Sequence, residues 1–574
     1  MDTTPTFSSL LPKAELDSEL AKYVEVPFTS DLISAMPESE QTALRHLARA
    51  AEDMNELYIS QIYEGSPAIA EALARQAVAE GEEVEPEMGS PVSGSSVLKS
   101  FWFYGGPWNE TEEKFIDDAA HTVPSSRLPG GSLYPTTATK EELERWMGGL
   151  SGAEHDDATS FFTVIRKEGA SFKSIPYSEE YASKLAGIAE SLQKAADSTS
   201  DEGLKKYLEA RAAAFFSNDY GESDYLWLGL NSSIDPTIGP YESYSDEHFA
   251  YKAFFEAYIC VVRPKETEQL QELRGVLQYV EDNLPVSPSL RNPSLGAGAA
   301  IKVVDQVYSG GEARSGVQTI AFNLPNNATT TSKYGTKRVM MRNANLAKFD
   351  RILRPIAERL VEEEQLDLIN FDAFFLHVLA HELMHGLGPH TVNVNCSNVV
   401  NCLDGKDVRE VLAEHYSAIE EGKADISGLW AIQFLHDNPP NGEPLSLFSS
   451  GLGLDSFYVT FLASAFRSLR FGAKEAHAQG IAIQLQQLME KGAVTRNETT
   501  NRYRVNLENM DTVKAAVEEI TGMMMTIQAN GDKAGAARLK ADAVAAVEAV
   551  AGKDLEKLSD IPVDVRPVFA LSPY

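Results

Sequence analysis

The sequence predicts an α+β protein that is predominantly helical, and three stretches of different periodicity carry this prediction. Residues 31–82 repeat apolar side chains at spacings of three and four, which is typical of amphipathic helices. Between about 225 and 345, short runs rich in β-branched and aromatic residues are broken by Gly and Asn-Pro, which indicates strands. From residue 350 to the end helical spacing returns. A β-containing region is therefore expected between two longer helical regions.

The elements follow in order from local composition. Residues 80–100 are rich in Pro, Gly, Ser and Glu and predict a loop or linker. Residues 101–150 mix aromatics, glycines and prolines without a period, which predicts irregular structure, whereas residues 140–216 return to a helical pattern. Three runs are expected to be strands, namely 257–262, 301–307 and 317–324. The segment 532–558 is expected to form a polar-faced helix or a helix pair.

Composition excludes some classes of function. The chain has 574 residues and a net charge of −34, which disfavours nucleic-acid binding because a phosphate backbone needs a face rich in Lys and Arg. An acidic cleft would suit a cationic group such as a peptide's free amine, although a solubilising surface is the simpler interpretation. No 18-residue apolar run and no signal-peptide pattern occur, so no membrane partner and a cytoplasmic location are expected. An exported form whose signal peptide has been removed stays open.

The three cysteines are too few for a disulfide framework, so reduced thiols are expected. Cys396 and Cys402 fall in one polar loop, however, where a single disulfide is an alternative if the protein is exported.

A His-Glu-x-x-His pattern occurs within residues 377–390, as His381-Glu382-Leu383-Met384-His385. Residues four apart lie on one face of a helix, so the two histidines could bind one ion while Glu382 stands beside it. Catalytic zinc usually has three protein ligands and a water, so a third ligand is needed. His377 extends the series but is expected to be a core or supporting histidine rather than a ligand.

The third ligand is expected on a second helix, predicted over residues 413–435 by its apolar spacing. Two histidines and one carboxylate from a later helix are a known zinc ligand set. Glu421 lies one turn before Asp425, so Glu421 could bind zinc while Asp425 accepts from the second ring nitrogen of a ligating histidine. A solvated acidic helix face is the alternative interpretation of these carboxylates.

The motifs HELMH and EEGKAD together resemble the zinc signatures of the dipeptidyl peptidase III family of metallopeptidases. Three further segments resemble the family in the same order, namely residues 234–262, the FNLPNN region beginning at Phe322, and KEAHAQG, which contains His477. The run YVEVPFTSDLISAMPESEQ also resembles shorter relatives, including plant proteins in which this peptidase domain follows a Nudix domain. No Nudix box occurs here, so pyrophosphohydrolase activity is not implied.

The resemblance implies a zinc-dependent peptidase that binds short peptides and releases dipeptides from their N-terminus. It implies one Zn²⁺ per chain, bound by His381, His385 and Glu421, with Glu382 as general base. His477 is implied as a donor to the transition state. The family's best-known members have one more residue between the histidines, whereas the tighter spacing here suits a regular helix.

The resemblance also implies supporting residues. Glu420 and Asp425 would be carboxylates that contact the metal ligands without binding the metal themselves. The implied substrate-binding residues come from two segments, and they are Asp235, Thr237, Glu242, Asn323 and Asn326. Asp235 stands where the family places an acidic residue that meets the substrate's amine, and Thr237 stands where the family has a tyrosine that donates to the oxyanion.

Two other functions stay open at this stage. The loss of the tyrosine at Thr237 favours a zinc-binding family member with little peptidase activity, in a binding or scaffold role. The intact Glu382 argues against it, since a purely structural zinc has no use for a general base. Hydrolysis of a non-peptide amide or ester would use every residue named. The oligomeric state is not indicated by the sequence.

The family's fold implies two lobes separated by a cleft. Residues 1–255, with 310–350 returning to them, are expected to form an N-terminal lobe that contains the β structure. Residues 256–309 and 351–574 are expected to form the mainly helical, zinc-binding lobe.

Overall fold

A computed structural model describes residues 7–81, 95–118, 122–295, 300–393, 403–448, 451–472 and 475–572. The chain divides into two compact units, and each is described by itself. The first comprises residues 1–264, 299–344 and 564–574, and the second comprises residues 265–298 and 345–563. The predicted class, a predominantly helical α+β protein with two lobes, is confirmed. No helix among the described residues is long and apolar enough to cross a membrane.

The first unit is built around a five-stranded sheet in the order β6-β7-β8-β10-β9. The β8–β10 pair is parallel and the other pairs are antiparallel. The sheet strands are β6 (Ile234–Glu242), β7 (Phe254–Val262), β8 (Ala300–Gly311), β9 (Ala321–Leu324) and β10 (Lys337–Met341). The strands outside it are β1 (Phe7–Ser9), β2 (Tyr23–Phe28), β3 (Ile116–Asp118), β4 (Thr163–Glu168), β5 (Ser171–Pro176) and β13 (Asp564–Phe569).

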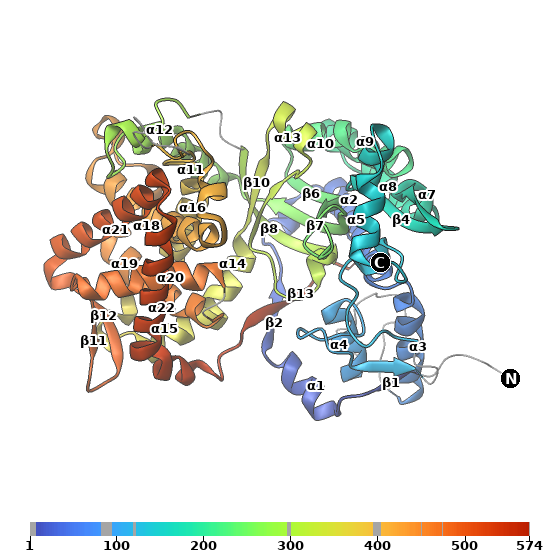
Figure 1. Cartoon of the computed structure of the whole chain (residues 1–574), viewed down its shortest axis with the longest axis horizontal. Helices are drawn as coiled ribbons and strands as arrows, with labels where there is room; N and C mark the ends of the chain where they lie inside the picture. Colours follow the sequence, from blue (N-terminus) through green and yellow to red (C-terminus); the bar gives the residue numbers. More distant parts are fainter. Residues whose placement is uncertain are drawn as a thin grey trace. The chain divides into compact units, whose positions relative to one another are not determined.

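The remaining elements of the first unit are helices, some of which lie beside this sheet while α1, α3 and α4 lie apart from it (Figure 1). They are α1 (Lys13–Leu20), α2 (Glu38–Ile62), α3 (Ser66–Ala79), α4 (Ser96–Tyr104), α5 (Lys140–Gly148), α6 (Ala153–Thr159), α7 (Tyr177–Glu180), α8 (Ala182–Ser198), α9 (Glu202–Ser217), α10 (Gly221–Leu228) and α13 (Ala328–Tyr334). Helix α2 packs on β7 and β8. Gly310 makes this possible, because a Cβ there would lie only 1.7 Å from the carbonyl oxygen of Ala51 on α2.

The second unit is almost entirely helical. Its helices are α11 (Pro264–Gly275), α12 (Leu277–Glu281), α14 (Arg342–Lys348), α15 (Arg354–Leu360), α16 (Phe371–Met384), α17 (Val408–Leu412), α18 (Tyr416–Asp437), α19 (Leu454–Leu469), α20 (Ala476–Glu490), α21 (Met510–Asn530) and α22 (Lys533–Leu555). A small hairpin, β11 (Val494–Asn497) and β12 (Arg502–Val505), interrupts them. Helix α18 lies at the centre, where α16, α20 and α21 pack against it, and is buried on nearly all sides, as its apolar residues require.

The domain boundaries predicted from the sequence need correction. Residues 256–309 were expected in the helical lobe, but β7 and β8 are inner strands of the sheet, and only residues 265–298 between them belong to the helical unit. Residues 564–574 were also expected there, but β13 pairs in parallel with β2 in the first unit. The hairpin β4–β5 lies within the stretch expected to be helical. Cys396 and Cys402 lie outside the described residues, and Cys260 is a buried free thiol.

Candidate metal centre

The two histidines of the HELMH motif lie at the C-terminal end of α16. Asn370 caps the start of this helix by accepting from the backbone N–H groups of Asp372 and Ala373. The helix ends at Met384, yet His385 keeps helical dihedral angles, with φ −59° and ψ −31°. The four-residue spacing is therefore realised on one regular helix face, and the Nε2 atoms of His381 and His385 lie 3.1 Å apart.

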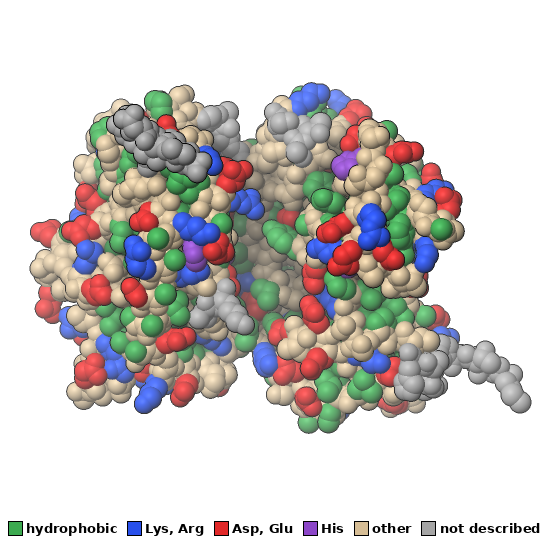
Figure 2. Space-filling view, viewed as in Figure 1, with side chains coloured by type: hydrophobic (Ala, Val, Ile, Leu, Met, Phe, Trp, Pro, Cys, Tyr) green, Lys and Arg blue, Asp and Glu red, His purple; other side chains and the backbone are tan. Residues whose placement is uncertain are grey.

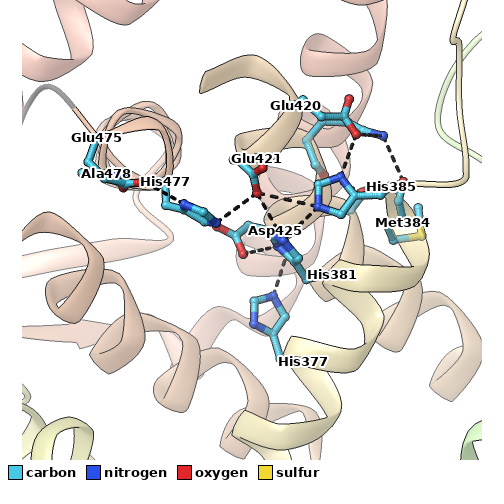
Figure 3. A network of polar contacts seen from close by, with 12 residues as sticks. His377, His381, Met384, His385, Glu420, Glu421, Asp425, Glu475, His477 and Ala478 are labelled. Carbon is cyan, nitrogen blue, oxygen red and sulfur yellow. Dashed lines mark hydrogen bonds and ion pairs between the residues drawn. The ribbon is translucent and has the colours of Figure 1, made fainter. Parts of the chain in front are cut away.

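Helix α18 brings three carboxylates to these histidines, because it crosses α16 at unusually short range. A Cβ at Gly428 would lie 2.9 Å from the backbone nitrogen of His381, so only glycine permits this approach. One turn earlier on α18 lies Asp425, and a further turn earlier lie Glu421 and Glu420 (Figure 3).

The donor atoms of three residues converge as a metal ion requires. Glu421 Oε2 lies 3.3 Å from His381 Nε2 and 3.7 Å from His385 Nε2. Tetrahedral zinc with bonds of about 2.0–2.2 Å separates its ligand atoms by roughly 3.3–3.6 Å, which these spacings approximate. Glu421 Oε2 is also buried and accepts no well-formed hydrogen bond, an arrangement that suits a ligand of a bound cation. Among the described residues, these three form the one group with metal-ligand spacing.

Each ligand histidine is held from behind by a carboxylate. His381 Nδ1 donates to Asp425 Oδ1 at 2.7 Å, and His385 Nδ1 donates to Glu420 Oε1 at 2.8 Å. Because a carboxylate only accepts, both Nδ1 atoms carry protons and both Nε2 atoms face the centre. Burial acts to lower the pKa of His381, but Asp425 and Glu421 raise it to about 10.

Glu420 has two further partners. Lys423 Nζ lies 2.8 Å from Glu420 Oε1, and Gln528 Nε2, on α21, donates to Glu420 Oε2 at 2.6 Å. Burial alone would raise the pKa of Glu420, but His385 and Lys423 lower it to about 2. Lys423 also donates to the carbonyl oxygens of Met384 and Leu387, so it fixes the end of α16. The predicted supporting roles of Glu420 and Asp425 thus agree with these contacts.

Two predicted catalytic groups flank the centre. Glu382 follows His381 on α16, is partly buried, and its charge contributes to the raised pKa of His381. His477, on α20, is 51% exposed, and its Nε2 lies 3.1 Å from Glu421 Oε2. The nearby carboxylates of Glu421 and Glu475 raise the pKa of His477 to about 10.

His377 is not among the three residues with metal-ligand spacing, and its ring contacts α18 and α19 instead. Its Nε2 donates to the backbone oxygen of Asp425 at 2.9 Å, and its ring lies edge-on to Phe461. The contact ties α16 to α18 behind the ligand histidines (Figure 3).

Of the predicted substrate-binding residues, Asp235 needs correction. It is 1% exposed, and Lys337 and Lys302 lie 2.8 and 3.1 Å from Asp235 Oδ2. Burial would raise the pKa of Asp235, but the two lysines hold it below its usual value. Its charge is thus already neutralised by lysines and is not free to meet an amine. Thr237 is likewise 1% exposed within β6, so its hydroxyl does not face solvent.

The remaining predicted substrate-binding residues, Glu242, Asn323 and Asn326, also lie in the first unit. Asn326 Nδ2 donates to Glu242 Oε2 at 2.7 Å, so these two lie together in the first unit. Burial raises the pKa of Glu242. Asn323, on β9, is exposed.

Several residues that support the metal centre were not predicted from the sequence. Gln528 lies about 100 residues from its motif partner, Glu420, and no local signal links them. Glu475 offers one signal, because acidic residues are enriched near the N-terminus of a helix. Gly422, Gly428 and Gly480 allow close helix approaches that only the packed structure reveals.

The fold and this centre define a metallopeptidase. Residues 154–420 match the model of peptidase family M49. Over 97% of its length the chain is 35% identical to Nudix hydrolase 3 of Arabidopsis thaliana, of which it covers 74%. The chain therefore belongs to peptidase family M49 and is a dipeptidyl peptidase III-like enzyme, as the sequence motifs predicted.

Two solved structures are similar along almost the whole chain. DPP III from Caldithrix abyssi has a TM-score of 0.84 and 35% identity, with 97% of this chain and 99% of that chain covered. Dipeptidyl-peptidase III from Corallococcus sp. strain EGB has a TM-score of 0.74 and 41% identity, with 97% and 98% covered.

Proposed function

We propose that this protein is a zinc-dependent peptidase that cleaves short peptides and releases dipeptides from their N-terminus. The observation that carries the metal assignment is the buried, unsatisfied Glu421 Oε2 facing the Nε2 atoms of His381 and His385. Dipeptide release is inferred from the similarity to the two structures of dipeptidyl peptidase III. Glu242 and Asn326, which lie together in the first unit, are the proposed substrate-binding residues.

The chemistry divides between the metal and the side chains around it. Bound zinc supplies Lewis acidity, which lowers the pKa of water from 15.7 to about 7 at the best-studied sites. Glu382 takes the proton of the attacking water and passes it to the leaving amine, a role typically worth about 10² to 10⁴ in rate.

Three further side chains stabilise charge or hold the ligand rings in place. His477 Nε2–H donates to the oxyanion that develops on the scissile carbonyl, and one such donor contributes about 10² to 10³. Asp425 and Glu420 hold the ligand rings so that neither histidine has to reorient during the reaction.

The metal assignment is tested by zinc analysis of the purified wild type and of Glu421→Ala. Wild type should hold about one zinc per chain, and the variant should lose most of it because a two-histidine set is incomplete. Unchanged zinc content in Glu421→Ala would remove Glu421 from the ligand set.

The reaction is tested with Glu382→Gln, which preserves shape but removes the proton acceptor. This variant should keep its zinc and its folding transition while hydrolysis of dipeptidyl-naphthylamides and short peptides falls about 10² to 10⁴-fold. Glu358→Gln, an exposed substitution on α15, is the matched control and should be fully active. Mass spectrometry identifies the products, and single amino acids or uncleaved peptides in place of dipeptides would contradict the proposed specificity.

A further inference from the structure

Glu475 makes two contacts at the start of α20, and one of them holds His477. As the N-cap residue, it accepts from the backbone N–H of Ala478 through Oε2 at 2.8 Å. Its Oε1 accepts from His477 Nδ1 at 2.7 Å (Figure 3). One carboxylate therefore connects the ring of His477 to the first turn of the helix that carries it.

The backbone of α20 is fixed independently of this carboxylate. Gly480 lies against Gly422 of α18, and a Cβ at Gly480 would lie 2.7 Å from the Gly422 nitrogen and 3.0 Å from the Ala418 oxygen. These backbone contacts set where the Cα of His477 lies relative to Glu421. They leave the two side-chain torsions of His477 undetermined.

Packing does not fix those torsions either. The His477 side chain is 51% exposed, and its ring centroid lies 6.2 Å from that of His381, a distance that allows only loose contact. Within the described ranges, the polar partners of the ring are two carboxylates, Glu475 at Nδ1 and Glu421 at Nε2. Glu421 is itself a metal ligand in the proposed function, so Glu475 is the partner that can hold the ring throughout the reaction.

We propose that Glu475 is a positioning residue for His477, and this proposal rests on the proposed function. Its carboxylate fixes the ring torsion and keeps a proton on Nδ1, so that Nε2 faces the centre. A ring turned by 180° would present a carbon atom where the donor is needed. Glu475 itself touches neither the metal ligands nor the substrate in this role.

The test separates the cap from the histidine contact. Serine is a good N-cap but is too short to reach Nδ1, so Glu475→Ser should keep the thermal stability and the zinc content. Its kcat should fall about 10 to 100-fold with little change in KM, the range typical of lost partners that orient a functional histidine. Glu475→Gln keeps the length and the polar contact to the ring, and should recover most of kcat.

A double-mutant cycle shows whether the loss passes through His477. In a His477→Ala background, Glu475→Ser should cause no further loss of kcat, because there is no ring left to position. An equal fold-change in both backgrounds would overturn the proposal, as would a fully active Glu475→Ser. The matched control is Asp532→Ser, which changes the N-cap of α22 but no residue of the centre and should leave kcat unchanged.

The outcomes also separate this proposal from the proposed function. If His477→Ala alone is fully active, the donor role of His477 is wrong and the proposed mechanism fails. If His477→Ala is strongly impaired but Glu475→Ser is not, the mechanism stands and only the positioning role of Glu475 is refuted.

Discussion

The substitution Gly480→Ala should displace His477, the proposed oxyanion donor, although it changes no side chain of the metal centre. The added Cβ would lie 2.7 Å from the Gly422 nitrogen and 2.9 Å from the Gly422 Cα, closer than real Cβ atoms approach. Both obstacles are backbone atoms of α18, so no side chain can turn away. Helix α20 must therefore move by about 0.7 Å to restore ordinary van der Waals contact.

The expected magnitudes follow from two opposing effects. Alanine is more favourable than glycine inside a helix by about 1 kcal/mol, whereas inserting a methyl into a packed interior costs about 1–3 kcal/mol. The net loss of unfolding free energy should thus be about 0–2 kcal/mol. Because displacements approaching 1 Å at a reacting centre can cost about 10²-fold, kcat should fall by roughly 10 to 100-fold.

The assay compares Gly480→Ala with Gly552→Ala on α22, where a Cβ meets nothing within 4 Å. The control should be at least as stable as wild type and fully active, since it gains only helix propensity. Both variants should hold their zinc, because the ligands lie on α16 and α18. If Gly480→Ala matches Gly552→Ala in kcat, the close helix contact does not position His477.

Two further predictions concern buried polar contacts. Gln528→Leu leaves a buried oxygen of Glu420 unpaired, so it should lower the unfolding free energy by about 1–3 kcal/mol and zinc affinity by about 10 to 100-fold. Chelator competition measures this affinity, and an affinity equal to that of Gln433→Leu, another buried amide, would contradict the orienting role. Asp235→Asn leaves two lysines without their carboxylate and should cost about 3–5 kcal/mol in thermal or urea unfolding. A raised KM with unchanged stability would instead return Asp235 to the substrate site.

The sequence predicted the metal centre better than the fold around it. His381, His385 and Glu421 were predictable because each motif lies on one continuous helix, whose periodicity fixes which side chains share a face. Asp425 followed from the same periodicity, one turn beyond Glu421. Helical periodicity is therefore sufficient to predict which functional side chains share a face when they lie on one helix.

The wrong predictions concern features that depend on contacts between segments far apart in the sequence. Asp235 was predicted to meet an amine, but Lys302 and Lys337 are about 70 and 100 residues away in sequence and reach it only through the folded sheet. The boundary error around 256–309 has the same origin, because the pairing of β7 with β8 spans the helical segment inserted between them. Which strands pair across such an insertion cannot be judged from the alternation within each strand.

The pairing of β13 with β2 has a consequence for how the protein is made. Arg566 contacts Glu25, 541 residues earlier in the chain, so β2 emerges from the ribosome long before its partner strand. At about 5–20 residues per second, that interval is roughly half a minute to two minutes. During this time β2 has an open edge of the kind that chaperones shield and that promotes aggregation. A truncated chain that lacks β13 would leave β2 without its partner strand, even if its metal centre had formed. The unpaired edge of β2 would therefore distinguish truncated chains from chains that contain β13.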